Sequence, residues 1–207
     1  MAEPIWQDLF DGKTLNGWTQ RNGKAQYTIE DGAIVGTTVL GEPNSFLCTD
    51  TIYGDFVLEL EFLVHPKMNS GVQIRSNSYA EYKDHRVHGY QVEIDPSDRA
   101  WTGGIYDEAR RGWLYNLENK PEAQKAFKQD GWNHFRIECR GTSIKTWVNG
   151  VPAADLEDGM TARGFIALQV HSTKEKDPMQ IKWRNIRLQD LDRAFPEAKP
   201  ESEQRKG

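Results

Sequence analysis

The segment HGYQVEID, residues 88–95, decides how this chain folds. Successive side chains of an extended strand point to opposite faces of a sheet. One face of this segment carries Tyr90, Val92 and Ile94. The other face carries an amide and two acids, Gln91, Glu93 and Asp95. The apolar face predicts burial in a core, whereas the polar face either contacts water or lines a site.

The same alternation recurs in short runs that are separated by glycine-containing turns. The clearest runs lie at residues 26–36, 56–64, 70–76, 89–95, 133–141, 143–152, 164–172 and 179–189. The Asn-Gly pair at 149–150 is a hairpin signal. Helical signal is confined to residues 120–131, and residues 96–119 form a long connection whose aromatic residues favour an ordered loop. We therefore predict an all-β sandwich or jelly roll with one short helix.

Three polar rows differ from the charged faces of the other strands. They are Gln73 with Arg75, Gln91 with Glu93 and Asp95, and Gln169 with His171. Amide, guanidinium, carboxylate and imidazole groups are suited to holding hydroxyls and moving protons. The alternating charges at 57–61 and 136–140, in contrast, need only a solvated sheet face. Whether the three rows meet on one concave face is left open by the sequence.

Composition restricts the class of partner. The 207 residues suffice for one domain with a sizeable core, and 31 acidic against 26 basic residues argue against nucleic-acid binding. No apolar run approaches the roughly 18 residues of a membrane span. No signal peptide is visible, but MAEPIW is compatible with a start Met placed before a mature N-terminus. Cys48 and Cys139 form either one bridge or two buried thiols, and free thiols are favoured.

Two other kinds of site are compatible with parts of the sequence. Residues 93–98, EIDPSD, resemble the Glu-x-Asp-x-x-Glu strand of laminarinase-like retaining glucanases, which need two carboxyls about 5 Å apart. Pro96 interrupts that strand and Asp98 is shorter than the expected Glu, so this mechanism is not favoured. No histidine has zinc-motif spacing. A divalent cation held by Glu93, Asp95 and His171 remains an open alternative.

A series of motifs occurs in one order along residues 5–191. They are FDGKTLNGW (10–18), GDFVLELEF (54–62), NSGVQIRS (69–76), GYQVEID (89–95), TGGIYDE (102–108), DGWNHFRIECRG (130–141), WVNG (147–150), GFIALQVHS (164–172) and IKWRNIRL (181–188). Together they make the chain similar to the 3-keto-disaccharide hydrolase domain family. The resemblance implies a concanavalin-like jelly roll of two antiparallel sheets, with sugar on the concave face. Residues 192–207 have the composition of a disordered tail.

The resemblance implies cleavage of glycosides that are already oxidised to a ketone at C3. Such a ketone acidifies the C2 proton, the glycosidic oxygen at C1 then leaves by elimination, and water adds back. We expect His171 or Glu93 to be the base and Arg75 to support the enolate oxygen, with a divalent metal ion as an optional aid. Hydroxyl orientation is expected from Gln73, Gln91, Asp95 and Gln169, and ring stacking from Trp101 or Tyr106. Where relatives carry Glu-x-Gln, this chain has Gln91-x-Glu93 on the same strand face.

Two functions of other classes remain in competition. A non-catalytic carbohydrate-binding module on the same fold would need aromatics and amides but no proton-transfer groups. An interaction domain of an extracellular assembly would use the basic and aromatic segment 109–117. Fold similarity does not separate these functions. For all three functions we expect a location in the periplasm or outside the cell. The sequence does not indicate an oligomeric state.

Overall fold

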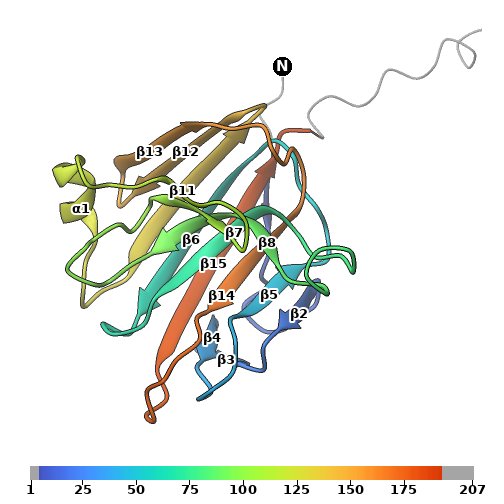
Figure 1. Cartoon of the computed structure of the whole chain (residues 1–207), viewed down its shortest axis with the longest axis vertical. Coiled ribbons are helices and arrows are strands. Elements are labelled where there is room, and N and C mark those ends of the chain that lie inside the picture. The colour runs from blue at the N-terminus through green and yellow to red at the C-terminus, as the bar shows by residue number, and fades with distance from the viewer. Residues whose placement is uncertain (1–4, 193–207) are drawn as a thin grey trace, which may run out of the picture.

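The chain forms a β-sandwich. The structure is a computed structural model that describes residues 5–192. Two antiparallel sheets stack on each other, and one short helix lies at the side of the sandwich (Figure 1). The predicted all-β fold of two antiparallel sheets is therefore confirmed. Among the described residues, no helix is long and apolar enough to cross a membrane.

The first sheet has eight strands, in the order β13-β12-β11-β6-β15-β4-β3, with β1 paired to β15. These strands are β1 (Trp6–Asp8), β3 (Gln26–Glu30), β4 (Ala33–Thr37), β6 (Phe56–Val64), β11 (Asn133–Arg140), β12 (Ser143–Val148), β13 (Val151–Glu157) and β15 (Gln180–Asp190). The second sheet has seven strands, in the order β10-β9-β8-β7-β14-β5-β2. They are β2 (Trp18–Asn22), β5 (Ser45–Thr49), β7 (Ser70–Asn77), β8 (His88–Ile94), β9 (Ile105–Glu108), β10 (Gly112–Tyr115) and β14 (Phe165–Val170).

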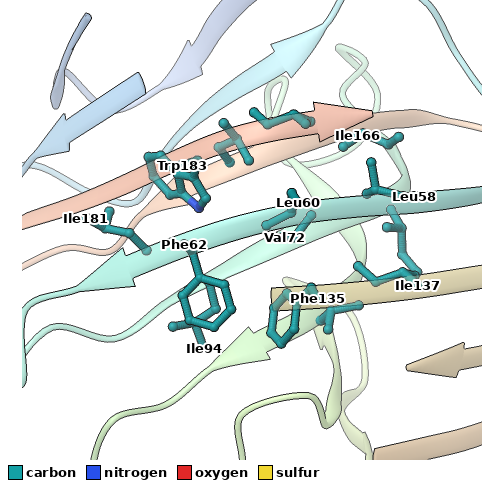
Figure 2. Close-up of a cluster of buried hydrophobic side chains, with 14 of the residues drawn as sticks. Leu58, Leu60, Phe62, Val72, Ile94, Phe135, Ile137, Ile166, Ile181 and Trp183 are labelled. Carbon is teal, nitrogen blue, oxygen red and sulfur yellow. The ribbon is translucent and has the colours of Figure 1, made fainter. Parts of the chain in front are cut away.

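The hydrophobic core lies between the two sheets and follows from the alternation of the strands. On β6, Leu58, Leu60 and Phe62 are fully buried, while Glu59 and Glu61 between them are partly exposed. Figure 2 shows the three β6 side chains packed among residues of neighbouring and facing strands. Those residues include Val72, Ile94, Phe135, Ile137, Ile166, Ile181 and Trp183. Burial of these side chains is the main stabilising contribution to the sandwich.

The outer faces of the two sheets differ. On β11 the outward residues His134, Arg136 and Glu138 are partly exposed, as expected for a solvated face. On β8 every residue is buried, including the outward-facing Gln91 and Glu93. The polar row that the sequence predicted on β8 is therefore not an ordinary solvated surface.

Two sequence predictions about connections are refined by the structure. The helix expected within 120–131 is α1 (Pro121–Ala126), which ends earlier than predicted. Phe127, directly after the helix, is extended, and the Asn133 side chain bonds both the backbone N–H and the carbonyl of Lys128, at 2.8 Å each. The connection 96–119 is ordered, as predicted, but it contains the short hairpin β9–β10, which was not predicted.

The cysteines are free, as favoured by the sequence. Cys48 on β5 and Cys139 on β11 are buried and lie in different sheets. The predicted disordered tail lies outside the described residues, except for Asp192. The Asp192 carboxylate accepts a hydrogen bond from Arg163 at 2.7 Å and another from the backbone N–H of Asp55.

Candidate functional site

A cavity of about 430 Å³ opens on the outer face of the seven-stranded sheet. This volume lies within the range of about 300–1,000 Å³ that is usual for ligand pockets. The lining residues are Asn44, Asn69, Arg86, Gln91, Glu93, Arg99, Tyr106, Glu108, Trp113, Gln169 and His171. Two of the three predicted polar rows therefore meet here, since β8 contributes Gln91 and Glu93 and the end of β14 contributes Gln169 and His171.

Strand register explains why these residues meet. Gly71 of β7 pairs with Glu93 of β8 on one side and with Gln169 of β14 on the other. Because Gly71 has no side chain, the sheet is indented between the two polar groups. The Gln91 side chain occupies part of this space, because a Cβ built on Gly71 would lie only 2.5 Å from Cδ of Gln91.

Glu93 is the most perturbed acid of the cavity. Its side chain is buried, and this burial raises the pKa of Glu93 to about 7, with a smaller contribution from the charge of Asp95. Hydrogen bonds from Asn69 (2.7 Å to Oε1) and Gln91 (2.8 Å to Oε2) oppose the rise. Arg99 lies 3.8 Å from Oε1. Glu93 can therefore exchange a proton near neutral pH, as a general acid or base must.

A chain of hydrogen bonds fixes the amide that faces Glu93. Ser76 Oγ donates to Gln73 Oε1 at 2.7 Å, and Gln73 Nε2 donates to Gln91 Oε1 at 2.7 Å. Gln91 Nε2 is thereby left to donate to Glu93. Gln73 is fully buried and does not line the cavity. It therefore orients Gln91 in this structure and does not contact a ligand, contrary to its predicted role.

His171 follows the last residue of β14 and lines the cavity. Its Nδ1 lies 2.8 Å from the carbonyl oxygen of Ser172. A carbonyl oxygen can only accept, so Nδ1 carries the proton and the neutral ring has its lone pair on Nε2. Among the described residues, that nitrogen has no hydrogen-bond partner. Neutral His171 can therefore accept a proton.

Arg75 does not lie in the cavity, so its position does not support the predicted role as oxyanion support. The strand is irregular at this point, and Arg75 has a φ of 45°. The alternation is interrupted, so the side chain is buried near the end of β7, which is an inner strand of its sheet. There the guanidinium donates to the carbonyl oxygens of Gly54 and Gly141 at 2.7 Å each and to Asp55 at 2.9 Å.

Asp95 also has another role than predicted. Its Oδ1 accepts bonds from the N–H and hydroxyl of Ser97, and its Oδ2 accepts from Arg99 Nε at 2.7 Å and from the N–H of Trp101. Asp95 therefore organises the loop after β8 and does not line the cavity. Within residues 5–192 no group of three His, Cys, Asp or Glu side chains is placed to hold a metal ion. Glu93, Asp95 and His171 thus do not form the ligand set that the sequence left open.

The loops supply two cations that the sequence did not predict. Arg99 is positioned by Asp95 and lies over the rings of Trp101 and Trp113, at 4.7 and 5.1 Å from their centroids. Arg86 lies 3.2 Å from Glu108. Both arginines occur in segments without periodicity, so no sequence pattern marked them.

The aromatic wall of the cavity consists of Tyr106 and Trp113, whose ring centroids lie 5.4 Å apart at 72°. Tyr106 was predicted, whereas Trp113 was not. Trp101 does not line the cavity and packs edge-on against Trp113, at a centroid distance of 4.8 Å. Its stacking role on a sugar is therefore not supported by its position.

A second carboxylate, Glu108, lines the cavity but is no partner for a retaining mechanism. Glu108 pairs with Gly89, four residues along β8 from Glu93. At about 3.3 Å per residue the two backbone positions are about 13 Å apart along the strand. Retaining glycosidases place their carboxyls about 5 Å apart.

Comparison with known proteins identifies the family. Residues 5–189 match the 3-keto-alpha-glucoside-1,2-lyase-like domain. The chain belongs to this family. The match confirms the resemblance drawn from the sequence motifs. No curated protein matches this lyase-like domain significantly.

Solved structures share the fold of this lyase-like domain. A putative glycosyl hydrolase from Parabacteroides distasonis is 18% identical, with a TM-score of 0.63 over 90% of this chain and 94% of that chain. The carbohydrate-binding module CBM66 from Bacillus subtilis is 18% identical, with a TM-score of 0.55 over 83% and 94%. A Bacillus subtilis protein with a galectin-like fold is 10% identical, with a TM-score of 0.61 over 90% and 98%. At these identities the similarity establishes the jelly-roll-like fold alone.

Proposed function

We propose that this chain cleaves 3-keto-glycosides or 3-keto-disaccharides by removal of the C2 proton and elimination at C1. The observation that carries the proposal is the pairing of two proton-transfer groups in one cavity. His171 has a free Nε2 lone pair, and Glu93 has a pKa raised to about 7 by burial. The membership of the chain in a 3-keto-alpha-glucoside-1,2-lyase-like family supports this substrate class.

In the proposed mechanism, His171 Nε2 takes the proton from C2, which the neighbouring C3 ketone acidifies. The electron pair of that C–H bond forms the C1–C2 double bond through the enolate, and the C1–O bond breaks. Glu93 in its protonated form gives its proton to the departing oxygen. Water that adds across the double bond completes net hydrolysis. Arg86 and Arg99 provide positive charge in the cavity as the enolate forms.

The test compares product release from a 3-keto-glucoside and 3-keto-trehalose with release from the same sugars before oxidation. We expect turnover of the keto sugars alone. His171→Ala and Glu93→Gln should each lower turnover by about 100-fold or more. His134→Ala is the matched control, because His134 lies on the outer face of the other sheet. A parallel reaction with chelator tests whether a divalent cation contributes.

The second candidate is a non-catalytic carbohydrate-binding module. The amide-lined floor and the Tyr106–Trp113 pair are compatible with sugar binding alone. Sugar binding without turnover of any keto substrate, and with affinity unchanged by His171→Ala, would favour this function over the enzyme.

A carbohydrate ligand fits either function, and we propose a periplasmic or extracellular location for both. The third alternative, a protein contact through segment 109–117, has less support. Both arginines of this segment are engaged within the chain. Arg110 bonds Asp107 at 2.7 Å, and Arg111 bonds Asp158 at 2.8 Å.

A further inference from the structure

Gln169 is a buried amide without a partner in the cavity floor. It lies on β14, between Gly71 of β7 and Phe46 of β5. The side chain is fully buried, and neither Oε1 nor Nε2 has a hydrogen-bond partner among the described residues. Buried polar groups are nearly always hydrogen-bonded, because desolvation without a partner is costly. Gln169 therefore requires a partner from the contents of the cavity.

The neighbouring side chains are already engaged and do not supply that partner. The Gln91 amide is held between Gln73 and Glu93. Asn69 donates to Glu93, and the side-chain oxygen of Asn44 accepts from the backbone N–H of Ser172. Gly71 has no side chain. The open side of Gln169 is thus the indentation between this residue and Glu93.

An amide presents one acceptor and one donor side by side. Its complement on a ligand is a donor next to an acceptor. In a vicinal diol either hydroxyl can take either part. In an α-hydroxy ketone the ketone can only accept, so the ligand fixes which end of the amide faces which oxygen.

We propose that Gln169 recognises the α-hydroxy ketone of the substrate, with Nε2 donating to the C3 carbonyl oxygen and Oε1 accepting from the C2 hydroxyl. This inference rests on the proposed function. The Nε2–H group then faces the oxygen on which negative charge develops when C2 loses its proton, which is where such a donor is most effective. Gln169 thereby takes the part that the sequence assigned to Arg75.

The test measures binding without turnover. Two ligands are used: a pyranose ring with a ketone at C3, a hydroxyl at C2 and only hydrogens at C1, and the same ring without the C2 hydroxyl. Neither has a leaving group at C1. Calorimetry gives the affinities for both ligands in the wild type, in Gln169→Met and in the control Gln20→Met. Gln20 lies on β2, the edge strand of the same sheet, and its side chain donates to the backbone carbonyls of Gly23 and Ala25.

We expect the wild type and Gln20→Met to bind the hydroxy ketone about tenfold more tightly than the deoxy ligand. Gln169→Met should bind both equally, because the partner of the C2 hydroxyl is gone. An undiminished ratio in Gln169→Met overturns the inference, whatever the absolute affinities. So does a wild type that does not distinguish the two ligands, in which case ordered water is the partner of Gln169.

A second variant keeps the test valid if Gln169→Met folds poorly. Gln169→Glu preserves the shape of the side chain and, when the introduced carboxyl is ionised, removes the donor. For this variant a third ligand is added, the same ring with a hydroxyl at C3 in place of the ketone. An ionised carboxylate accepts from that hydroxyl but repels the ketone oxygen, so the ratio of alcohol affinity to ketone affinity should be about tenfold higher in Gln169→Glu than in the wild type. A ratio equal to that of the wild type overturns the inference. The assay of product release remains separate. Absence of turnover with the predicted binding ratios refutes the proposed mechanism but not the recognition by Gln169.

Discussion

The side chain of Gln91 lies over Gly71, so that a Cβ at position 71 would be 2.5 Å from both Cγ and Cδ of Gln91. The absence of a side chain at Gly71 allows the Gln91 amide to reach Glu93. A methyl group at position 71 would therefore displace Gln91 and so change the environment of Glu93 without contacting Glu93.

Gly71→Ala should displace Gln91 and reduce turnover while the fold is retained. The clash involves a side chain that can move, so we expect a loss of unfolding free energy of about 1–2 kcal/mol. Thermal unfolding and turnover of the same preparation measure the two effects. Gly131→Ala is the control, because the nearest atom of the described residues to a Cβ there, Cβ of Lys128, is 4.0 Å away. Unchanged turnover in Gly71→Ala would show that the position of Gln91 is not required.

The raised pKa of Glu93 predicts a dependence of stability on pH. The pKa of Glu93 is about 7 in the folded chain, against 4.5 for an ordinary glutamate. Between these values the folded state binds more protons than the unfolded state, so stability falls as pH rises from about 4.5 to 7. The total loss is about 3 kcal/mol. Denaturant unfolding of wild type and Glu93→Gln across pH 4–8 tests this.

The difference between the two proteins isolates the contribution of Glu93 from those of the other acids. Glu93→Gln should gain stability relative to wild type as pH rises, and the gain should level off above pH 7. If the unfolding free energies of the two proteins differed by a constant amount at every pH from 4 to 8, the prediction would be contradicted. In activity, the acid role of Glu93 predicts that turnover declines above about pH 7 as the carboxyl loses its proton.

The hydrogen-bond chain from Ser76 predicts a graded effect on Glu93. In Gln73→Met the Gln91 amide loses the donor that fixes its orientation, so the carboxylate is less well stabilised and the pKa of Glu93 rises. Ser76→Ala, one bond farther away, should raise it less, and Gln91→Met should raise it most. Carbon-13 NMR of labelled Glu carboxyls across the titration measures the three values. Equal pKa values in all three variants would exclude the chain as the cause.

Arg75 and Arg99 should respond in opposite ways to substitution. Arg75→Met should destabilise the fold by about 3 kcal/mol, because the change leaves Asp55 and two carbonyls without their buried partner. Turnover below the unfolding temperature should be preserved. Arg99→Met should lower turnover and leave the free energy of unfolding nearly unchanged, since the Arg99 side chain lines the cavity but is 42% exposed. Loss of turnover in a folded Arg75→Met would restore the oxyanion role that the sequence predicts for it.

The alternation of residues by itself determined much of this protein. It predicted the sheets, the buried face of β6 and the polar face that carries Gln91 and Glu93. It also placed Gln169 and His171 on one strand face. These predictions hold because a period of two residues is a local property of an extended chain, and burial of one face follows from it.

The tertiary structure alone decided which polar groups meet. The irregularity at Arg75 interrupts the alternation and depends on how β7 pairs with its neighbours. Arg86 and Arg99 enter the cavity from loops whose conformation is set by distant contacts. The burial of Gln73 and the missing partner of Gln169 are likewise consequences of packing. Pairing between strands and loop conformation arise from residues far apart in sequence, so no local pattern contains them.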